Sequence, residues 1–305
     1  MPNLEAIIRS IDRLEPISPI AVEVVGLLDN DEYRFMEVAN LVSQDPALAA
    51  NVLRMVNSAY YGLKCRTDTI RDALALLGAR RMAELILMFS LNQTYNAGCC
   101  RRTSSEGGHL WHTAVVTANL SREISKLSGI GNPGRIFTAA LVRDIGKIVI
   151  DQFAVAADRE IRDVVEAEGI GLDEAEQRVL GIGHAELGAR VAESWGFPGS
   201  IVRIIRNHHR EVAPDGADDR MDQRETSIVR CAEEIYLRFE GGEEGAMDPA
   251  GCGAAASFLT EAQFHGLMYT LMRARLDLRL FLDEMHSSMN SSCQIGNCAI
   301  DYKSL

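Results

Sequence analysis

Apolar side chains recur at intervals of three and four residues along almost the whole chain, which is the pattern of amphipathic α-helices. The first apolar stripe lies between Leu4 and Leu14. A later helix is expected to begin at Asp45-Pro46, because aspartate accepts hydrogen bonds from free amides and proline suits the first helical turn. Residues 135–153 are expected to form one helix, and alternating strand patterns are scarce. The sequence therefore predicts an all-α fold, a multi-helix bundle with an N-terminal helical subdomain.

Two breaks in the helical pattern divide the chain. Residues 96–108 are polar and contain glycine, and residues 241–253 form a glycine-rich segment. Such stretches are typical of loops between packed units. We expect an N-terminal helical half at 1–100 and a helical bundle at 101–240. Residues 241–305 are expected to hold a glycine-rich loop, a long C-terminal helix and a flexible tail.

Short polar patterns predict where several helices begin and end. Thr260 followed by Gln263 resembles a capping box for the last helix. Asp173 followed by Glu176 resembles a capping box for a short helix earlier in the chain. Asn57 and Ser58 interrupt an apolar helix, and this polar pair is expected to cap the C-terminus of that helix and fix the turn into Tyr60-Tyr61-Gly62.

The formal net charge of −12 limits the partners of this chain. An acidic protein repels a phosphate backbone unless a local basic patch overcomes the field. The richest basic segment, residues 203–210, is followed at once by acidic residues. A helix-turn-helix interpretation around Gly78 is disfavoured, because the second helix is too apolar to lie in a DNA groove. We therefore expect no nucleic-acid partner.

Targeting signals are not apparent in the sequence. The N-terminus lacks a basic-then-apolar signal pattern, and no stretch approaches the roughly 20 apolar residues of a membrane span. Seven cysteines, an odd number, are scattered along the chain and are expected to be reduced thiols. These features predict a cytoplasmic protein without a membrane partner.

Five of the seven histidines fall between His109 and His209. Imidazole is the usual nitrogen ligand of transition metals. These histidines and nearby charged residues are separated by whole helices, so they can converge only in the core of a bundle. The groups that form this candidate pocket are His112, Arg143, Asp144, Lys147, His184, His208, His209 and Glu233.

Six short motifs follow one another in a specific order. They are Ser43–Leu48, Val56–Gly62, Ile70–Gly78, Trp111–Thr113, Leu141–Lys147 and His184–Gly188. This order resembles the HD superfamily of metal-dependent phosphohydrolases, and more closely its HDOD branch, the HD-related output domain of bacterial signalling proteins. The resemblance covers about residues 14–239, and it implies that the expected bundle at 101–240 is HD-like.

The resemblance also implies where a metal would be held. In catalytic relatives, an upstream histidine, an HD pair and a downstream aspartate hold one or two ions that activate a water for attack on phosphate. The matching positions in this chain are His112, Asp144, His184, His208, His209 and Glu233. An iron, manganese or zinc ion, if one binds, would take as ligands His112, Asp144, His184 and His208.

The chain departs from the family pattern at Arg143, which stands where the family has a metal-ligating histidine. A guanidinium cannot coordinate a cation and stays protonated at physiological pH. An ion pair between Arg143 and Asp144 would fill the place of the metal, and Lys147 is a second cation within reach. We therefore expect a degenerate pocket with no catalytic residue and no cofactor.

Several of these residues also have an ordinary structural interpretation. His112 would be a partly buried histidine that hydrogen-bonds a neighbour. His208 and His209 would be a helix-end pair, placed favourably against the negative end of the helix dipole. Trp111 and Trp195 are expected in the core.

The resemblance implies a signal-transduction or output module that binds a protein partner or a small nucleotide-like ligand through its degenerate pocket, and the final helix could support a homodimer. The alternative is an active metal-dependent phosphohydrolase that tolerates Arg143. A DNA-binding regulator is the weakest alternative, since its binding would have to overcome the net charge of −12.

Overall fold

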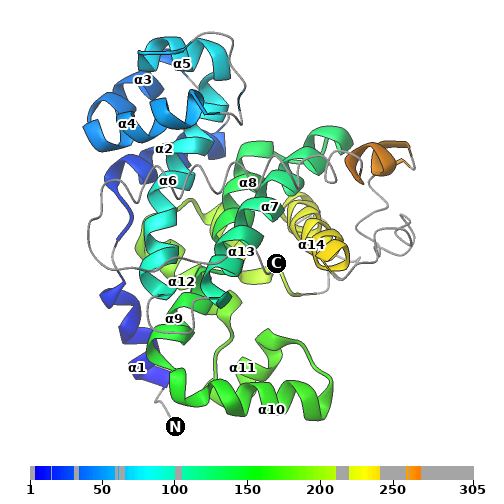
Figure 1. Cartoon of the computed structure of the whole chain (residues 1–305). Helices are drawn as coiled ribbons and strands as arrows, with labels where there is room; N and C mark the ends of the chain where they lie inside the picture. Colours follow the sequence, from blue (N-terminus) through cyan, green and yellow to red (C-terminus); the bar gives the residue numbers. More distant parts are fainter. Residues whose placement is uncertain are drawn as a thin grey trace.

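The computed structural model of this chain is built from α-helices (Figure 1). It describes residues 4–14, 16–30, 34–58, 61, 66–99, 105–210, 220–240, 259–260 and 262–268. No strand occurs in these ranges, so the expected all-α class is confirmed. Within the same ranges, no helix combines the length and the apolar character that a membrane crossing requires.

The helices up to residue 99 form an N-terminal group that begins beside the bundle and ends in the long helix α6 (Figure 1). Their bounds are α1 Leu4–Ser10, α2 Pro19–Asn30, α3 Phe35–Ser43, α4 Pro46–Val56, α5 Ile70–Leu77 and α6 Ala79–Cys99. Helices α3, α4 and α5 pack on one another at one end of the molecule, while α2 and α6 connect them to the bundle.

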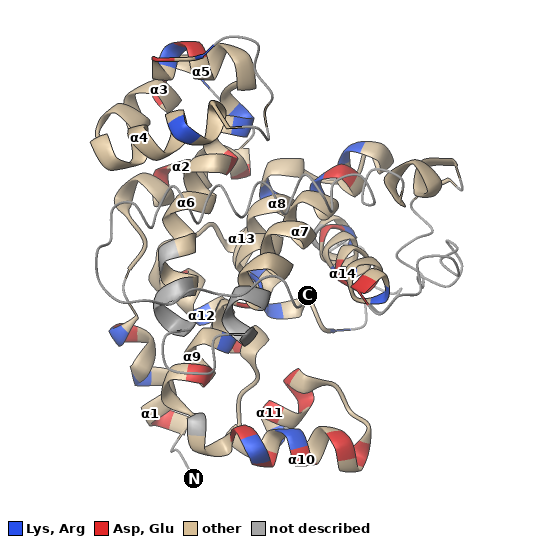
Figure 2. Ribbon diagram, in the orientation of Figure 1, with Lys and Arg blue, Asp and Glu red and all other residues tan. Residues whose placement is uncertain are grey.

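The remaining described helices form the bundle. Their bounds are α7 Ser105–Ser128, α8 Pro133–Val142, α9 Ile145–Phe153, α10 Asp158–Glu168, α11 Leu172–Leu180, α12 His184–Ser194, α13 Gly199–Asn207 and α14 Arg220–Glu240. Helix α8 packs against α7, α13 and α14, and α9 packs against α12. Helices α10 and α11 form a hairpin at the opposite end from α5, and charged residues are frequent along it (Figure 2).

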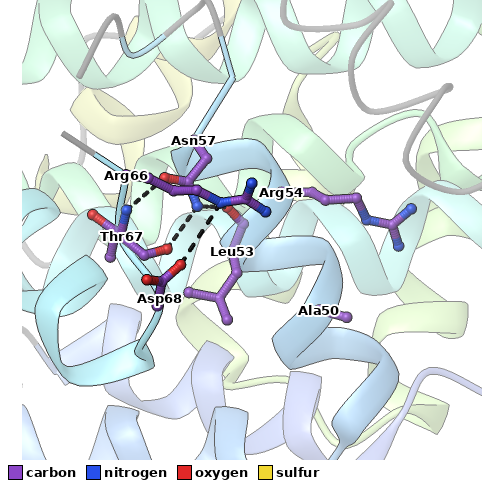
Figure 3. A pocket seen from close by; sticks show the side chains of 7 residues that line it. All are labelled: Ala50, Leu53, Arg54, Asn57, Arg66, Thr67 and Asp68. Carbon is purple, nitrogen blue, oxygen red and sulfur yellow. Dashed lines mark hydrogen bonds and ion pairs between the residues drawn. The ribbon is translucent and has the colours of Figure 1, made fainter. Parts of the chain in front are cut away.

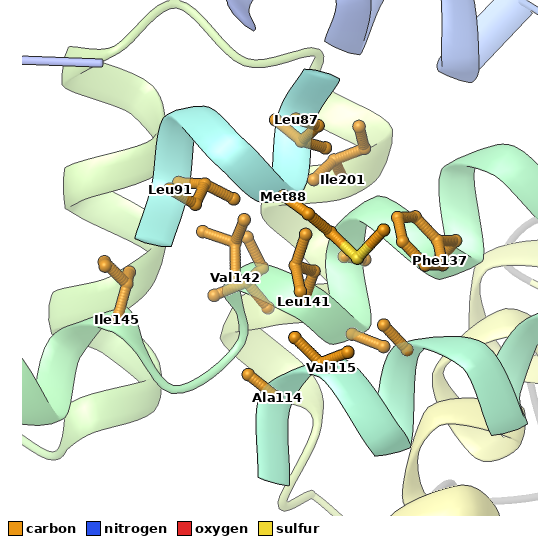
Figure 4. Packing of buried hydrophobic residues seen from close by; sticks show 14 of the residues in the cluster. Leu87, Met88, Leu91, Ala114, Val115, Phe137, Leu141, Val142, Ile145 and Ile201 are labelled. Atoms are coloured by element: carbon orange, nitrogen blue, oxygen red, sulfur yellow. The ribbon is translucent and has the colours of Figure 1, made fainter. Parts of the chain in front are cut away.

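One continuous apolar core joins the two groups of helices. Met88 of α6 is buried among residues of α7 and α8, including Val115 and Phe137 (Figure 4). Trp111 and Trp195 are 3% and 8% exposed, which confirms their expected place in the core. Because α6 is buried against the bundle, the N-terminal group is attached to it by tertiary packing as well as by the chain.

Local capping explains several of the helix ends. The side chain of Asp45 accepts hydrogen bonds from the amides of Ala47 and Leu48 at 2.8 and 3.0 Å, which confirms the expected start of α4. The capping box of Thr260 and Gln263 is also confirmed, with the Thr260 amide donating to the Gln263 side chain at 2.8 Å. The last helix is described only as far as residue 268, so its expected length, the 241–253 loop and the tail lie outside the described residues.

Asn57 caps the C-terminus of α4, as predicted, whereas most of the turn into Tyr60-Tyr61-Gly62 lies outside the described residues. The side-chain amide of Asn57 donates to the carbonyls of Leu53 and Thr67 at 2.8 and 2.7 Å, and its side-chain oxygen accepts from the Thr67 amide at 2.7 Å. This arrangement holds the extended segment 66–68 beside α4 (Figure 3). A cavity of about 540 Å³ lies there, lined by Ala50, Leu53, Arg54, Asn57, Arg66, Thr67 and Asp68.

Residues 135–153 do not form the single helix that their apolar pattern predicted. Helix α8 ends at Val142, and α9 begins at Ile145. The break falls at Arg143 and Asp144, which are 0% and 1% exposed. The chain therefore turns at a buried pair of oppositely charged residues.

Candidate functional site

The turn between α8 and α9 lies directly against the start of α12. A methyl group on Gly146 would come within 2.1 Å of the His184 carbonyl oxygen and 2.7 Å of the Gly188 nitrogen. Only a glycine permits this close approach of the α9 and α12 backbones. The contact places Asp144 and His184 in one buried pocket.

Arg143 points into this pocket. Its Nη2 lies 2.9 Å from Oδ2 of Asp144 and 3.4 Å from Oε1 of Glu233, and its Nη1 donates to the Ala140 carbonyl at 2.9 Å. The expected ion pair between Arg143 and Asp144 is therefore present, and Glu233 of α14 is a second anion on the same guanidinium.

Asp144 is paired on both of its oxygens. Nζ of Lys147, one turn along α9, lies 2.7 Å from Oδ1, while Arg143 occupies Oδ2. Burial alone would raise the pKa of Asp144, but the charges of Arg143 and Lys147 outweigh burial and hold this pKa well below its usual value. Asp144 is consequently an ionised carboxylate, already neutralised by protein cations.

Three histidine rings form the other side of the pocket. Nε2 of His184 lies 2.9 Å from Nε2 of His209 and 3.5 Å from Oδ1 of Asp144. His208 Nδ1 must donate its hydrogen to the Ile205 carbonyl, 2.6 Å away, because a carbonyl can only accept. Nε2 of the neutral His208 ring then carries a lone pair, and this atom is buried without a hydrogen-bond partner.

Two acidic residues of α11 hold His184 in place. Oε2 of Glu176 accepts from the His184 amide at 2.7 Å and lies 2.6 Å from its ring Nδ1. Oδ1 of Asp173 accepts from the next amide, that of Ala185, at 2.9 Å. These acids therefore satisfy free amides at the start of α12.

The proposed capping box of Asp173 and Glu176 for their own helix is therefore wrong. Helix α11 begins after Gly171, without a side-chain cap. The same two carboxylates lie 12 and 8 residues before the amides that they accept from. Sequence reasoning missed their role at the pocket because it considered only the nearest helix start.

Burial shifts the pKa values of Glu176 and His184 in opposite directions. It raises the pKa of Glu176 to about 8 and lowers the pKa of His184 to about 3. At neutral pH both groups are therefore uncharged, and the pair holds the hydrogen of the carboxyl group between the two side chains. The pair of Glu176 and His184 is thus neutral, in contrast to the ionised Asp144 beside Arg143.

The structure does not gather all the predicted metal ligands. Among the described residues, ligand atoms within 4.8 Å of one another occur in the groups His184, His208, His209 and Asp173, Glu176, His184. Neither group contains His112, whose Nδ1 lies 3.0 Å from the hydroxyl of Tyr236 on α14. The hydrogen-bonded histidine expected at position 112 is thus observed.

A comparison with protein families decides the assignment. The model of the HDOD domain matches residues 14–211, about two thirds of the chain. The chain belongs to the HDOD family. The resemblance of its motifs to this family is thereby confirmed.

Known proteins similar to this HDOD chain come from several bacteria. An uncharacterised protein of Treponema pallidum (strain Nichols) is 25% identical over 208 residues, which are 65% of this chain but only 38% of that protein. The chain thus spans well under half of the length of this relative.

Solved structures share the fold. An HDOD domain protein of unknown function from Geobacter sulfurreducens has a TM-score of 0.73 and 23% identity, covering 93% of this chain and 98% of its own. A protein of Shewanella amazonensis SB2B, named as a phosphohydrolase candidate, has a TM-score of 0.68 and 22% identity, covering 92% and 97%. A signal-transduction candidate of Marinobacter aquaeolei VT8 has a TM-score of 0.70 and 18% identity, covering 94% and 62%.

The HDOD pocket does not fit the metal centre of a hydrolytic HD protein. Both oxygens of Asp144 face protein cations, and the guanidinium of Arg143 stands between Asp144 and Glu233. A cation held by these carboxylates would have to displace a buried arginine. Among the described residues, ligand atoms that could hold a metal ion remain in the group His184, His208 and His209 and in the group Asp173, Glu176 and His184.

Proposed function

We propose that this HDOD chain is a non-catalytic signal-transduction module, which acts by binding a protein partner or a small nucleotide-like ligand at its degenerate pocket. The observation that carries the proposal is the completely buried Arg143, paired with both Asp144 and Glu233. The resemblance to the HD superfamily places Asp144 and Glu233 among the ligands of a metal that would activate water. Here those carboxylates neutralise protein cations.

The polar groups of the pocket are arranged for binding. Lys147 and Glu233 retain 24% and 14% side-chain exposure, so they stand closest to solvent among the paired charges. They offer an incoming ligand one hydrogen-bond donor and one acceptor, while Arg143 and Asp144 behind them remain paired. Partner binding is also consistent with the signalling role named for the similar Marinobacter protein.

The second candidate is a metal-dependent phosphohydrolase, which the cluster of His184, His208 and His209 favours. Metal content measured by mass spectrometry, on protein purified without chelator or nickel resin, separates the two functions. The binding module predicts metal well below one ion per chain and no hydrolysis of bis-p-nitrophenyl phosphate. Near-stoichiometric iron, manganese or zinc, with turnover that is lost in Asp144→Ala, would establish the enzyme instead.

Arg143→His extends this test by restoring the histidine of the family pattern. If Arg143 is what closes the metal site, the variant should bind more metal than the wild-type protein. Arg190→His, at an exposed pair with Glu186 on α12, is the matched control for a new histidine and should bind no more than the wild type. Equal metal content in all three proteins would show that Arg143 does not determine metal binding.

A further inference from the structure

Helices α8 and α14 are joined by two arginine–glutamate pairs at the same sequence offset. Arg135 Nη1 lies 3.3 Å from Oε1 of Glu225, and Arg143 Nη2 lies 3.4 Å from Oε1 of Glu233. The two arginines are eight residues apart, as are the two glutamates. Eight residues span about 12 Å along a helix. The two helices therefore run in the same direction, with one register satisfying both pairs.

The first of these, the junction pair Arg135–Glu225, is tied to the N-terminal helices. Arg135 Nε lies 2.5 Å from Oδ1 of Asp29 in α2, and Ser200 Oγ donates to the same oxygen at 2.8 Å. The Asn132 side chain donates to the Asp29 carbonyl at 2.8 Å. Residues of α2, α8, α13 and α14 thus meet at the junction pair.

The backbone before α8 is shaped around Glu225. This side chain is 0% exposed and accepts the Asn132 amide at 2.9 Å. Gly131 has a φ of +70°, and a methyl group there would lie 2.6 Å from the Glu225 side chain. Since the glycine makes room for a buried carboxylate, any movement of Glu225 along α14 must be accompanied by movement at Gly131 and Asn132.

The second, the pocket pair Arg143–Glu233, belongs to the candidate site. The Arg143 guanidinium also holds Asp144 at 2.9 Å. Within its bounds α8 carries a single charged residue, Arg135, and Arg143 follows directly after its end (Figure 2). Two arginines at α8 thus form ion pairs with α14, one at the junction and one in the pocket.

We propose that α8 and α14 couple the pocket to α2 through this shared register. A ligand or partner that draws Arg143 or Glu233 out of the pocket pair then changes the contacts of Asp29 at the junction pair. Breaking either buried pair leaves a charge without its partner, which is costly away from water. A small displacement of α14 that relieves one pair changes the other. The inference rests on the proposed function, because it describes the regulation of the same pocket.

Hydrogen exchange at the Asn132 amide tests this coupling. Glu233→Gln weakens the pocket pair, and the Asn132 amide, bonded to Glu225, reports on the junction about 12 Å away. The coupling predicts exchange at Asn132 about tenfold faster, measured relative to the core amide of Val191 in α12. That reference removes any effect of global unfolding. Glu234→Gln, at the neighbouring half-exposed pair with Arg238, is the control and should leave Asn132 unchanged.

The proposal would be overturned if, in Glu233→Gln, the exchange rate of the Asn132 amide changed only by the same factor as that of the Val191 amide. If that variant does not fold, the reciprocal variant Glu225→Gln is examined through the NMR signal of the Arg143 Nε–H group. Coupling between two sites is reciprocal, so this signal must shift, and an unchanged signal would overturn the proposal equally. Neither result depends on metal or turnover, so failure of the coupling is distinguishable from failure of the proposed function.

Discussion

The two sides of the pocket satisfy their polar groups in different ways. On the charged side, Arg143 and Lys147 neutralise Asp144 and Glu233 over distances of 2.7 to 3.4 Å. On the histidine side Glu176 and His184 are uncharged at neutral pH, and Nε2 of His208 is buried without a hydrogen-bond partner. One side is closed by protein charges, whereas the other still presents ligand atoms.

The two sides differ because their polar groups have different roles in the folded chain. His184 is held by Glu176 through a backbone amide at the start of α12, so its position is fixed by helix capping. The geometry of the histidine side is therefore stabilised without a metal. On the charged side, Asp144 needs a cation because it is ionised and 1% exposed, and Arg143 supplies one. The charged side is thus the place where an arginine can replace an ion.

Removing Arg143 should produce the largest effect on stability. Arg143→Ala leaves Asp144 and Glu233 buried with one cation fewer, and breaking such a buried pair costs about 3–5 kcal/mol. Urea unfolding at pH 7 measures the loss. Arg162→Ala, at the exposed pair with Asp158 in α10, is the control and should change stability by less than about 1 kcal/mol. Equal losses in the two variants would contradict the role of Arg143 as the buried counter-ion of Asp144 and Glu233.

A methyl group at Gly146 should have the next largest effect, because it forces the two sides apart. It would come within 2.1 Å of the His184 carbonyl, so Gly146→Ala should lower the free energy of unfolding by about 2–3 kcal/mol. Gly26→Ala is the matched control, since nothing lies within 4 Å of its added methyl in α2. That control should be neutral or stabilising by up to about 1 kcal/mol.

If Gly146→Ala is as stable as the control, the approach of α9 to α12 is not what assembles the pocket. A spectral change confined to the histidine rings, with Asp144 still paired, would be the sign that the sides separate as predicted. Ring signals of His184 and His208 therefore accompany the unfolding measurement.

Part of this arrangement could be predicted from the sequence, because its causes are local. Asp45 and Thr260 lie beside the amides that they cap, so the pattern of neighbouring residues was sufficient. The pairing of Asp144 was also predictable, since Arg143 and Lys147 lie one and three residues away. The observed pairs confirm that short-range electrostatics survive in the folded chain.

The remainder depends on contacts between distant segments. The apolar pattern of residues 135–153 continues across the break, and no proline interrupts it. Gly146 allows the close approach of α9 to α12, about 40 residues later, and the local pattern does not show this contact. Glu233 reaches Arg143 across 90 residues, and no local rule could have shown that it is the second anion there.

The pH dependence of stability distinguishes the two sides by a smaller effect. Burial raises the pKa of Glu176 to about 8 from 4.5, so between these values the folded chain holds a proton that the unfolded chain has lost. The free energy of unfolding therefore falls as pH rises. Burial lowers the pKa of His184 to about 3 from 6.5, which gives the opposite slope below pH 6.5. Above pH 6.5 only the decrease due to Glu176 remains.

Glu176→Gln should remove that decrease, because glutamine keeps the uncharged form at every pH. Between pH 6.5 and 8 the wild-type protein is expected to lose about 1 kcal/mol per pH unit from this group, and the variant should not. Urea unfolding at several pH values in this window measures the slope. Glu174→Gln, on the exposed side of α11 in a pair with Arg178, is the control and should keep the wild-type slope. A slope that persists in Glu176→Gln would mean that Glu176 is already ionised beside His184, and that the histidine side carries a charge like the other.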